Sequence, residues 1–216
     1  MKRKSIFYCA VVLSLLSVKA NCFEVIVIDQ NENPVSNAVV SIPQGEITSV
    51  SKEPAVMDQV NRQFLPTVLA VQKGREVLFP NSDNIRHHVY SFSKPKPFQI
   101  KLYKGVPKSP VLFDQDGLVV LGCNIHDKMV GYIYVSPWPT FKKTDKTGLL
   151  SFDLDPSLEY PKQVQVWHPW VEGLTKPLDI DVPSDLTGPL VVTLKTNPPK
   201  PVADWKSKFK KYHDER

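Results

Sequence analysis

The amino-acid sequence predicts an all-β protein with two domains. Its 216 residues include 20 prolines, and proline is poorly tolerated inside helices and central strands. Most apolar residues fall in short runs rich in Val, Ile, Phe and Tyr, the residue types that favour strands. No long stretch shows the apolar spacing of an amphipathic helix. The length exceeds that of a typical single domain, which favours two domains over one.

Short apolar runs between turn-forming residues predict the strands in chain order. The first two flank a turn-forming cluster at Asp29–Pro34, and this arrangement predicts a hairpin. The predicted strands are Phe23–Ile28, Ala38–Ile42, Glu76–Phe79, Val89–Phe92, Leu118–Leu121, Gly131–Val135, Leu149–Leu154, Gln163–Trp167 and Leu190–Leu194.

The first 20 residues have the order of a secretory signal peptide. A basic start, Met1 to Lys4, precedes an apolar run from Ile6 to Leu16 and a small-residue end at Ala20. The run is too short to span a membrane as a helix, which takes about 20 residues. We therefore expect cleavage after Ala20 and export to the periplasm.

The charge distribution gives no sign of a nucleic-acid partner. Residues 1–20 hold four cations and no acid, so their removal lowers the formal net charge from +5 to +1. The last 17 residues then carry +3 and the rest about −2. A basic stripe along one domain, which nucleic-acid binding favours, is missing.

A basic tail is expected at residues 198–216. Four of its apolar side chains have the spacing of one helical face, with lysines opposite. Docking of this face on the preceding domain is preferred over contact with a membrane or an acidic partner. The four residues are Val202, Trp205, Phe209 and Tyr212.

Two of the three cysteines remain after signal removal, and they leave two interpretations open. Cys22 and Cys123 could form a disulfide, and a loop of about 100 residues would contribute on the order of 4 to 5 kcal/mol. Cys22, however, lies at a terminus, whereas Cys123 lies among metal-ligating residues. Lipidation of Cys22 is disfavoured because Asn21, not a small residue, precedes it.

Cys123, His126 and Met129 offer a thiolate, an imidazole and a thioether at spacings of three residues. Soft sulfur together with imidazole selects copper, and two His with one Cys and a weak axial Met is the donor set of blue-copper sites. Zinc fits less well because a thioether is a poor ligand for it. We expect Cys123 at the end of a strand, followed by a tight loop that returns His126 and Met129.

A second imidazole must come from elsewhere in the chain. His87 and His88 form the only histidine-bearing segment between Cys22 and Cys123. They precede a predicted strand, where neighbouring side chains point to opposite faces. Only one of the two histidines is therefore expected to face the metal.

The combined motif resembles the cupredoxin family, which includes plastocyanin, pseudoazurin and amicyanin. It runs Val71-x-x-Gly-x-x-Val-x-Phe-x-Asn81, His87-x-Val89, and Cys123-x-x-His-x-x-Met-x-Gly-x-Ile-x-Val135. The short loop from Cys to Met is most similar to amicyanin. The resemblance implies a Greek-key β-sandwich at residues 56–138, inserted in the rest of the chain.

The same resemblance implies a ligand set for one type 1 copper ion. His87 is the first ligand, and Cys123, His126 and Met129 complete the site. His88 takes the place where plastocyanin-like proteins usually have Asn. The resemblance also implies that the edge of the His126 ring reaches the surface and passes the electron.

The flanking segments resemble a carboxypeptidase regulatory-like, or transthyretin-like, β-sandwich. A discontinuous domain at 21–55 and 139–197 would then surround the insertion, as is possible when the termini of an inserted domain lie close together. The whole resembles plastocyanin-like proteins labelled methylamine utilization proteins. The residues that carry the similarity are Asp29, Pro34, Val35, Ala38, Val40, Thr144, Asp145 and Gly148.

These observations predict a periplasmic one-electron carrier, not an enzyme, with a protein redox partner. No second metal cluster, acid-base pair or nucleophile arrangement is evident in the sequence. Two alternatives stay open, namely copper trafficking with the same ligands and a structural module with a degenerate site. His168, His213 and the Trp167–Trp170 aromatic cluster are interpreted as packing.

Overall fold

The computed structural model describes residues 22–155, 159–173 and 176–198. Every regular element in these ranges is a β-strand, which confirms the all-β prediction. The same ranges contain no helix long and apolar enough to span a bilayer. The predicted signal peptide, and the basic tail from residue 199 onward, lie outside the described residues.

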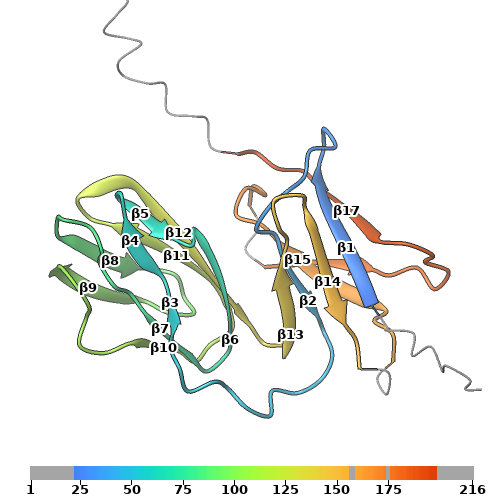
Figure 1. Cartoon of the computed structure of the whole chain (residues 1–216), viewed down its shortest axis with the longest axis horizontal. Helices are drawn as coiled ribbons and strands as arrows, with labels where there is room; N and C mark the ends of the chain where they lie inside the picture. Colours follow the sequence, from blue (N-terminus) through green and yellow to red (C-terminus); the bar gives the residue numbers. More distant parts are fainter. Residues whose placement is uncertain (1–21, 156–158, 174–175, 199–216) are drawn as a thin grey trace, which may run out of the picture.

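The strands form two regions, which we call terminal and central (Figure 1). The terminal region comprises β1 (Cys22–Asp29), β2 (Val39–Ile42), β13 (Thr140–Lys143), β14 (Leu149–Asp153), β15 (Gln163–Trp167), β16 (Leu178–Asp181) and β17 (Leu190–Leu194). The central region comprises β3 (Ala55–Val56), β4 (Asp58–Val60), β5 (Gln63–Leu65), β6 (Val68–Gln72), β7 (Arg75–Leu78), β8 (His87–Ser91), β9 (Phe98–Tyr103), β10 (Val111–Phe113), β11 (Gly117–Cys123) and β12 (His126–Ser136).

Two sheets build the terminal region, with strand orders β14-β1-β17 and β13-β2-β15-β16. Alternate residues of both sheets meet in one apolar core, to which β1 contributes Val25 and Val27 and β2 contributes Val40 and Ile42. The predicted hairpin of the first two strands is therefore wrong. Strands β1 and β2 lie in different sheets, and their apolar faces are buried against each other in the core between the sheets.

Two further sheets and the β4–β5 hairpin build the central region. The larger sheet has the order β6-β12-β11-β8-β9, and the smaller has the order β10-β7-β3. Both contribute to a second apolar core, for example through Val77 and Phe113 from the smaller sheet and Val89 and Leu121 from the larger one. Strand β9 is an edge of the larger sheet.

A third apolar cluster joins the two regions. It contains Val39 and Trp167 from the terminal region and Val68 and Tyr134 from the central region. Polar contacts add to it, because Ser41 Oγ lies 3.0 Å from the Tyr134 hydroxyl. The chain enters the central region after β2 and returns to the terminal region at β13.

Candidate metal centre

Cys123 and His126 are cross-strand neighbours because β11 and β12 change register at the end of their ladder. The pairing is regular as far as Gly122 with Val130, but the next residue, Cys123, pairs with His126. Continuing the regular register would have placed Cys123 opposite Met129. The extra residues of β12, the last of them Met129, form a bulge, a device that redirects side chains next to functional sites. The expected return toward Cys123 is thus made within a strand pair.

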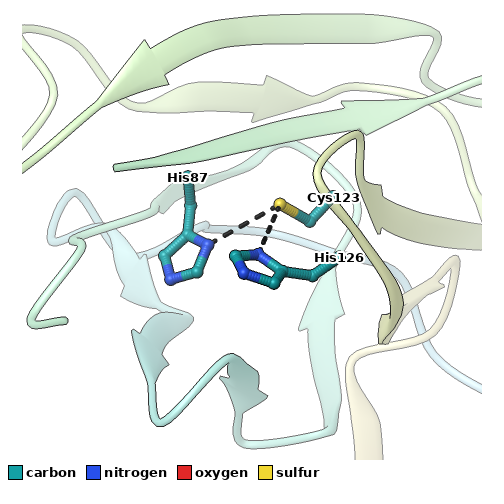
Figure 2. A group of neighbouring side chains, drawn as sticks. All are labelled: His87, Cys123 and His126. Carbon is teal, nitrogen blue, oxygen red and sulfur yellow. Dashed lines mark hydrogen bonds between the residues drawn. The ribbon is translucent and has the colours of Figure 1, made fainter. Parts of the chain in front are cut away.

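Three donor atoms converge at this point (Figure 2). The Cys123 Sγ lies 3.6 Å from His87 Nδ1 and 3.7 Å from His126 Nδ1. One ligand atom from each residue lies within 4.8 Å of the other two. Two ligands of one metal in a trigonal site, with bonds of about 2.0 Å to nitrogen and 2.3 Å to sulfur, lie about 3.7 Å apart. The two sulfur-to-nitrogen distances therefore suit one shared ion.

Hydrogen bonds can also join the three groups when no metal is bound. A neutral thiol has one hydrogen, so Cys123 donates to at most one of the two rings. Cys123 and His87 are both buried, with exposed fractions of 3% and 0%. The sulfur can accept a hydrogen from the other ring, so the argument for a metal ion comes from the distances among the three donor atoms and from their soft donor chemistry.

His87 is fixed in orientation by the carboxylate of Asp83. Its Nε2 lies 2.6 Å from Asp83 Oδ2. A carboxylate accepts hydrogen bonds, so Nε2 carries a hydrogen, and in the neutral ring Nδ1 then has a lone pair that faces Cys123. A metal-binding histidine commonly has such an outer partner, which holds the tautomer and the ring angle.

Asp83 is itself held by the turn of the β4–β5 hairpin. The backbone N–H groups of Asn61 and Arg62 donate to its two carboxylate oxygens at 2.7 and 2.8 Å. Both turn residues have positive φ angles, 51° and 60°, as in the two-residue turns that join tight hairpins. Burial acts to raise the pKa of Asp83, but the hydrogen bonds from Arg62, His87 and Asn61 outweigh it and the pKa is lowered.

His88 points away from this cluster. Strand β8 alternates, with His87 and Val89 buried and His88 and Tyr90 partly exposed. The His88 ring instead contacts Tyr90, with ring centroids 5.8 Å apart. Of the two candidate histidines, the structure therefore brings only His87 to Cys123.

His126 and Met129 complete the set of sequence-predicted residues. Met129 is 1% exposed and belongs to the same apolar core as Cys123. His126 is partly exposed, and its pKa is lowered, first by desolvation and then by His87 and Arg62. The imidazole is therefore neutral at pH 7, the form that binds metals.

The disulfide alternative is wrong. Both cysteines are free, with Cys123 buried and Cys22 exposed. Cys22 belongs to the terminal region, where its Sγ lies 3.0 Å from Ser151 Oγ. The thiol of Cys123 is consequently available to a metal.

Asp83 is the residue of the site that the sequence analysis missed. It lies in a polar run, Asn81-Ser-Asp-Asn84, four residues before His87. A carboxylate shortly before a candidate histidine ligand is the signal that could have identified it, since such groups commonly orient metal-binding histidines.

Structural comparisons find copper proteins over part of the chain. A copper-containing nitrite reductase from Thermus scotoductus SA-01 is 25% identical over 44% of this chain, with a TM-score of 0.38, and the match spans only 25% of that protein. A reduced Cu(I) form of amicyanin is 19% identical over 45% of this chain and 98% of its own, with a TM-score of 0.35. A Sinorhizobium pseudoazurin is 21% identical over 40% of this chain and 76% of its own, with a TM-score of 0.31.

No protein-family model and no curated protein matches the chain. Because the three TM-scores are all below 0.5, the case for a metal centre rests on the side chains themselves.

Proposed function

We propose that this protein is a periplasmic one-electron carrier that binds one type 1 copper ion through His87, Cys123, His126 and Met129. The observation that carries the proposal is the convergence of the Cys123 thiol with two imidazole Nδ1 atoms at 3.6 and 3.7 Å. One thiolate and two imidazoles suit copper better than the hard divalent cations, which prefer oxygen ligands.

The chain's own residues prepare the site for a metal that changes its oxidation state. Copper, when bound, supplies the one-electron change between Cu(I) and Cu(II). Asp83 and the hairpin turn hold His87 before binding, so the ligand set needs little rearrangement. The apolar core around Cys123 and Met129 excludes water and helps to set the potential. Met129, at the end of the bulge, would hold the ion as a fourth, weakly binding ligand through its thioether.

The proposal includes the division of the chain into domains. Residues 56–138 would be a cupredoxin domain inserted into a discontinuous, transthyretin-like sandwich at 21–55 and 139–197. The separate apolar cores of the central and terminal regions support this division. We infer a carrier rather than an enzyme, because the proposal assigns no acid-base pair and no nucleophile to the site.

The visible spectrum of the copper-loaded chain tests the proposal. A thiolate bound to Cu(II) gives an intense blue charge-transfer band, so Cys123→Ser should abolish the band. The matched control is Cys22→Ser, which removes the other free thiol and should leave the band unchanged. A wild-type chain without the band, or a band that survives Cys123→Ser, would contradict the proposal.

A chelator experiment separates the carrier from the trafficking alternative. A carrier keeps its metal through many redox cycles, so Cu(I) should be lost to a mild chelator only over hours. Complete loss within seconds would favour copper trafficking.

A further inference from the structure

An aromatic row lies on the outer face of β8, the face opposite the metal centre. Tyr90 lies between His88 and Phe92, with ring-centroid distances of 5.8 and 5.2 Å. The row becomes more exposed along the chain, since His88 and Tyr90 are partly buried and Phe92 is 87% exposed. Leaving a phenyl ring in water forgoes a burial worth about 1.5 to 3 kcal/mol. Apart from its contact with the Tyr90 ring, Phe92 contributes little burial to the fold.

This face is separated from the metal centre by the thickness of one strand. Neighbouring residues in a strand point to opposite sides, so Gly122 faces outward while Cys123 faces inward. The Tyr90 ring covers Gly122 closely, since a Cβ at Gly122 would lie 2.7 Å from Tyr90 Cζ. A molecule bound over Tyr90 would therefore lie on the opposite side of β11 from the Cys123 thiol.

The same face is hollowed beside the aromatic row. A concavity of about 410 Å³ is lined by side chains of the row and of the adjoining edge strand, together with Asn124. One buried nitrogen next to it, His88 Nε2, has no hydrogen-bond partner. The lining residues are His88, Tyr90, Ser91, Phe92, Pro97, Phe98, Gln99 and Asn124.

The surroundings of the face are cationic. The segment 84–113, which contains β8 and β9, has six Lys or Arg residues and no Asp or Glu. Lys94 follows Phe92 and is exposed, and Lys101 is exposed on the edge strand β9. Only Lys96 of this segment forms an ion pair within the described residues, with Asp114 at 3.3 Å. Lys94 and Lys101 therefore add exposed positive charge on the segments next to the aromatic row.

Edge protection does not account for this combination. Lysines on an edge strand discourage pairing with other chains, which would explain Lys101 on β9. Exposed apolar side chains have the opposite effect, yet Phe92, Leu102 and Val106 in the same segment are each more than half exposed. Aromatic anchors with cationic neighbours are instead typical of a surface that binds a protein.

We propose that the outer face of β8 and β9, centred on Tyr90 and Phe92, is the docking surface for a redox partner protein with an acidic surface. The proposal rests on the proposed function for the identity of the partner. It places the partner on the far side of β11 from the metal, at the backbone of Gly122 and Cys123. This surface differs from the exposed edge of His126, which the sequence resemblance implied.

A charge-reversal experiment tests the cationic part of the surface. The probe is a gold electrode coated with a mixed layer of carboxylate- and methyl-terminated alkanethiols, which mimics an acidic protein surface. The variant Lys94→Glu/Lys101→Glu should lower the bound amount at low ionic strength by about tenfold. The matched control is Lys52→Glu/Lys146→Glu, which changes the net charge equally at exposed positions elsewhere and should change binding by less than twofold. Equal losses for the two variants would overturn the proposal.

A second variant tests the aromatic anchor. Phe92→Ser should weaken binding to the mixed layer by about tenfold, because the exposed ring is the part that partner contact buries. Since Phe92 is 87% exposed, the variant should fold normally. The matched control is Val191→Ser on β17, where Val191 is 56% exposed in the terminal region. Unchanged binding by Phe92→Ser would overturn the proposal, as would tighter binding to vesicles of anionic lipid than to the mixed layer.

The two proposals can fail separately. Binding is measured with a microbalance for the copper-free and the copper-loaded chain, and the rate of electron transfer is measured by voltammetry on the loaded chain. If no blue band appears but binding to the mixed layer still depends on Lys94, Lys101 and Phe92, only the carrier function is contradicted. A blue band and fast transfer that are insensitive to Lys94, Lys101 and Phe92 would sink the docking surface alone.

Discussion

The central and terminal regions each bury a histidine, and the two histidines have different surroundings. His87 in the central region is 0% exposed, and His168 after β15 in the terminal region is 2% exposed. His87 contacts a carboxylate on one nitrogen and a thiol on the other. His168 instead bonds to the backbone, accepting from Trp170 N–H at 3.3 Å and contacting Ser36.

The difference shows that burial alone does not mark a metal ligand. Burial lowers the pKa of His168 to about 4, so this ring is neutral at pH 7 and has the protonation state that a metal requires. Among the described residues, His168 has no cluster of other metal-ligating side chains around it, and the one candidate metal group is His87, Cys123 and His126. Convergence of donor atoms therefore distinguishes His87, the candidate ligand, from His168.

The largest expected effect is the loss of copper affinity when His87 is replaced. Replacing His87 with Ala removes one of three converging donors, so copper affinity should fall by more than the ~100-fold typical of losing an outer-shell partner. His88→Ala should keep the blue band, because His88 points to the opposite face. Titration of each copper-free chain with copper, followed in the visible spectrum, measures both. A band lost only in His88→Ala would reverse the assignment.

The next effect concerns the structural histidine and pH. The folded pKa of His168 is about 4, below the ordinary value of about 6.5. Between these values the unfolded chain takes up a proton that the folded chain does not. This contribution to the free energy of unfolding is therefore complete above pH 6.5 and is lost as the pH falls toward 4, by about 3 kcal/mol in total.

Urea unfolding of the copper-free chain between pH 4 and 7 measures this loss. His168→Gln cannot take up the proton, so its stability should depend less on pH by the same amount. Parallel pH profiles for the variant and the wild type would show that His168 does not bear the shift.

A smaller effect sharpens the role of Asp83. Asp83→Asn replaces the acceptor of His87 Nε2, and loss of such an outer partner typically lowers metal affinity 10- to 100-fold. The matched control is Asp58→Asn, since Asp58 accepts from Ser82 in the same loop and does not bond to His87. Competition with a copper chelator measures both affinities, and equal losses would mean that loop stability, not His87, is responsible.

The smallest effect on stability is expected at Met129. Met129→Leu is nearly volume-conserving, so it should lower the free energy of unfolding of the copper-free chain by less than about 1.5 kcal/mol. The reduction potential should nevertheless change, because a blue-copper potential depends on the axial ligand. Met57→Leu, at another fully buried methionine of the same core, is the control and should leave the potential unchanged. A potential unaffected by both substitutions would remove Met129 from the site.

The sequence by itself determined the strand-rich class and pointed to most of the proposed donor set. Alternating apolar residues mark strands wherever one face is buried, and each predicted strand overlaps a strand of the structure. Cys123, His126 and Met129 were identifiable because they lie close together in sequence and share soft donor chemistry. Short strands with weak patterns, such as β3 to β5 and β16, were not predicted.

Only the tertiary structure decided which partners meet across long stretches of chain. It placed β1 and β2 in different sheets, brought His87 rather than His88 to Cys123, and joined Asp83 to the hairpin turn at Asn61 and Arg62. Alternation indicates that a strand has one buried and one exposed face. It does not tell which residues of other strands pack against the buried face. Sheet order and register settle those questions, and both depend on packing among residues far apart in the sequence.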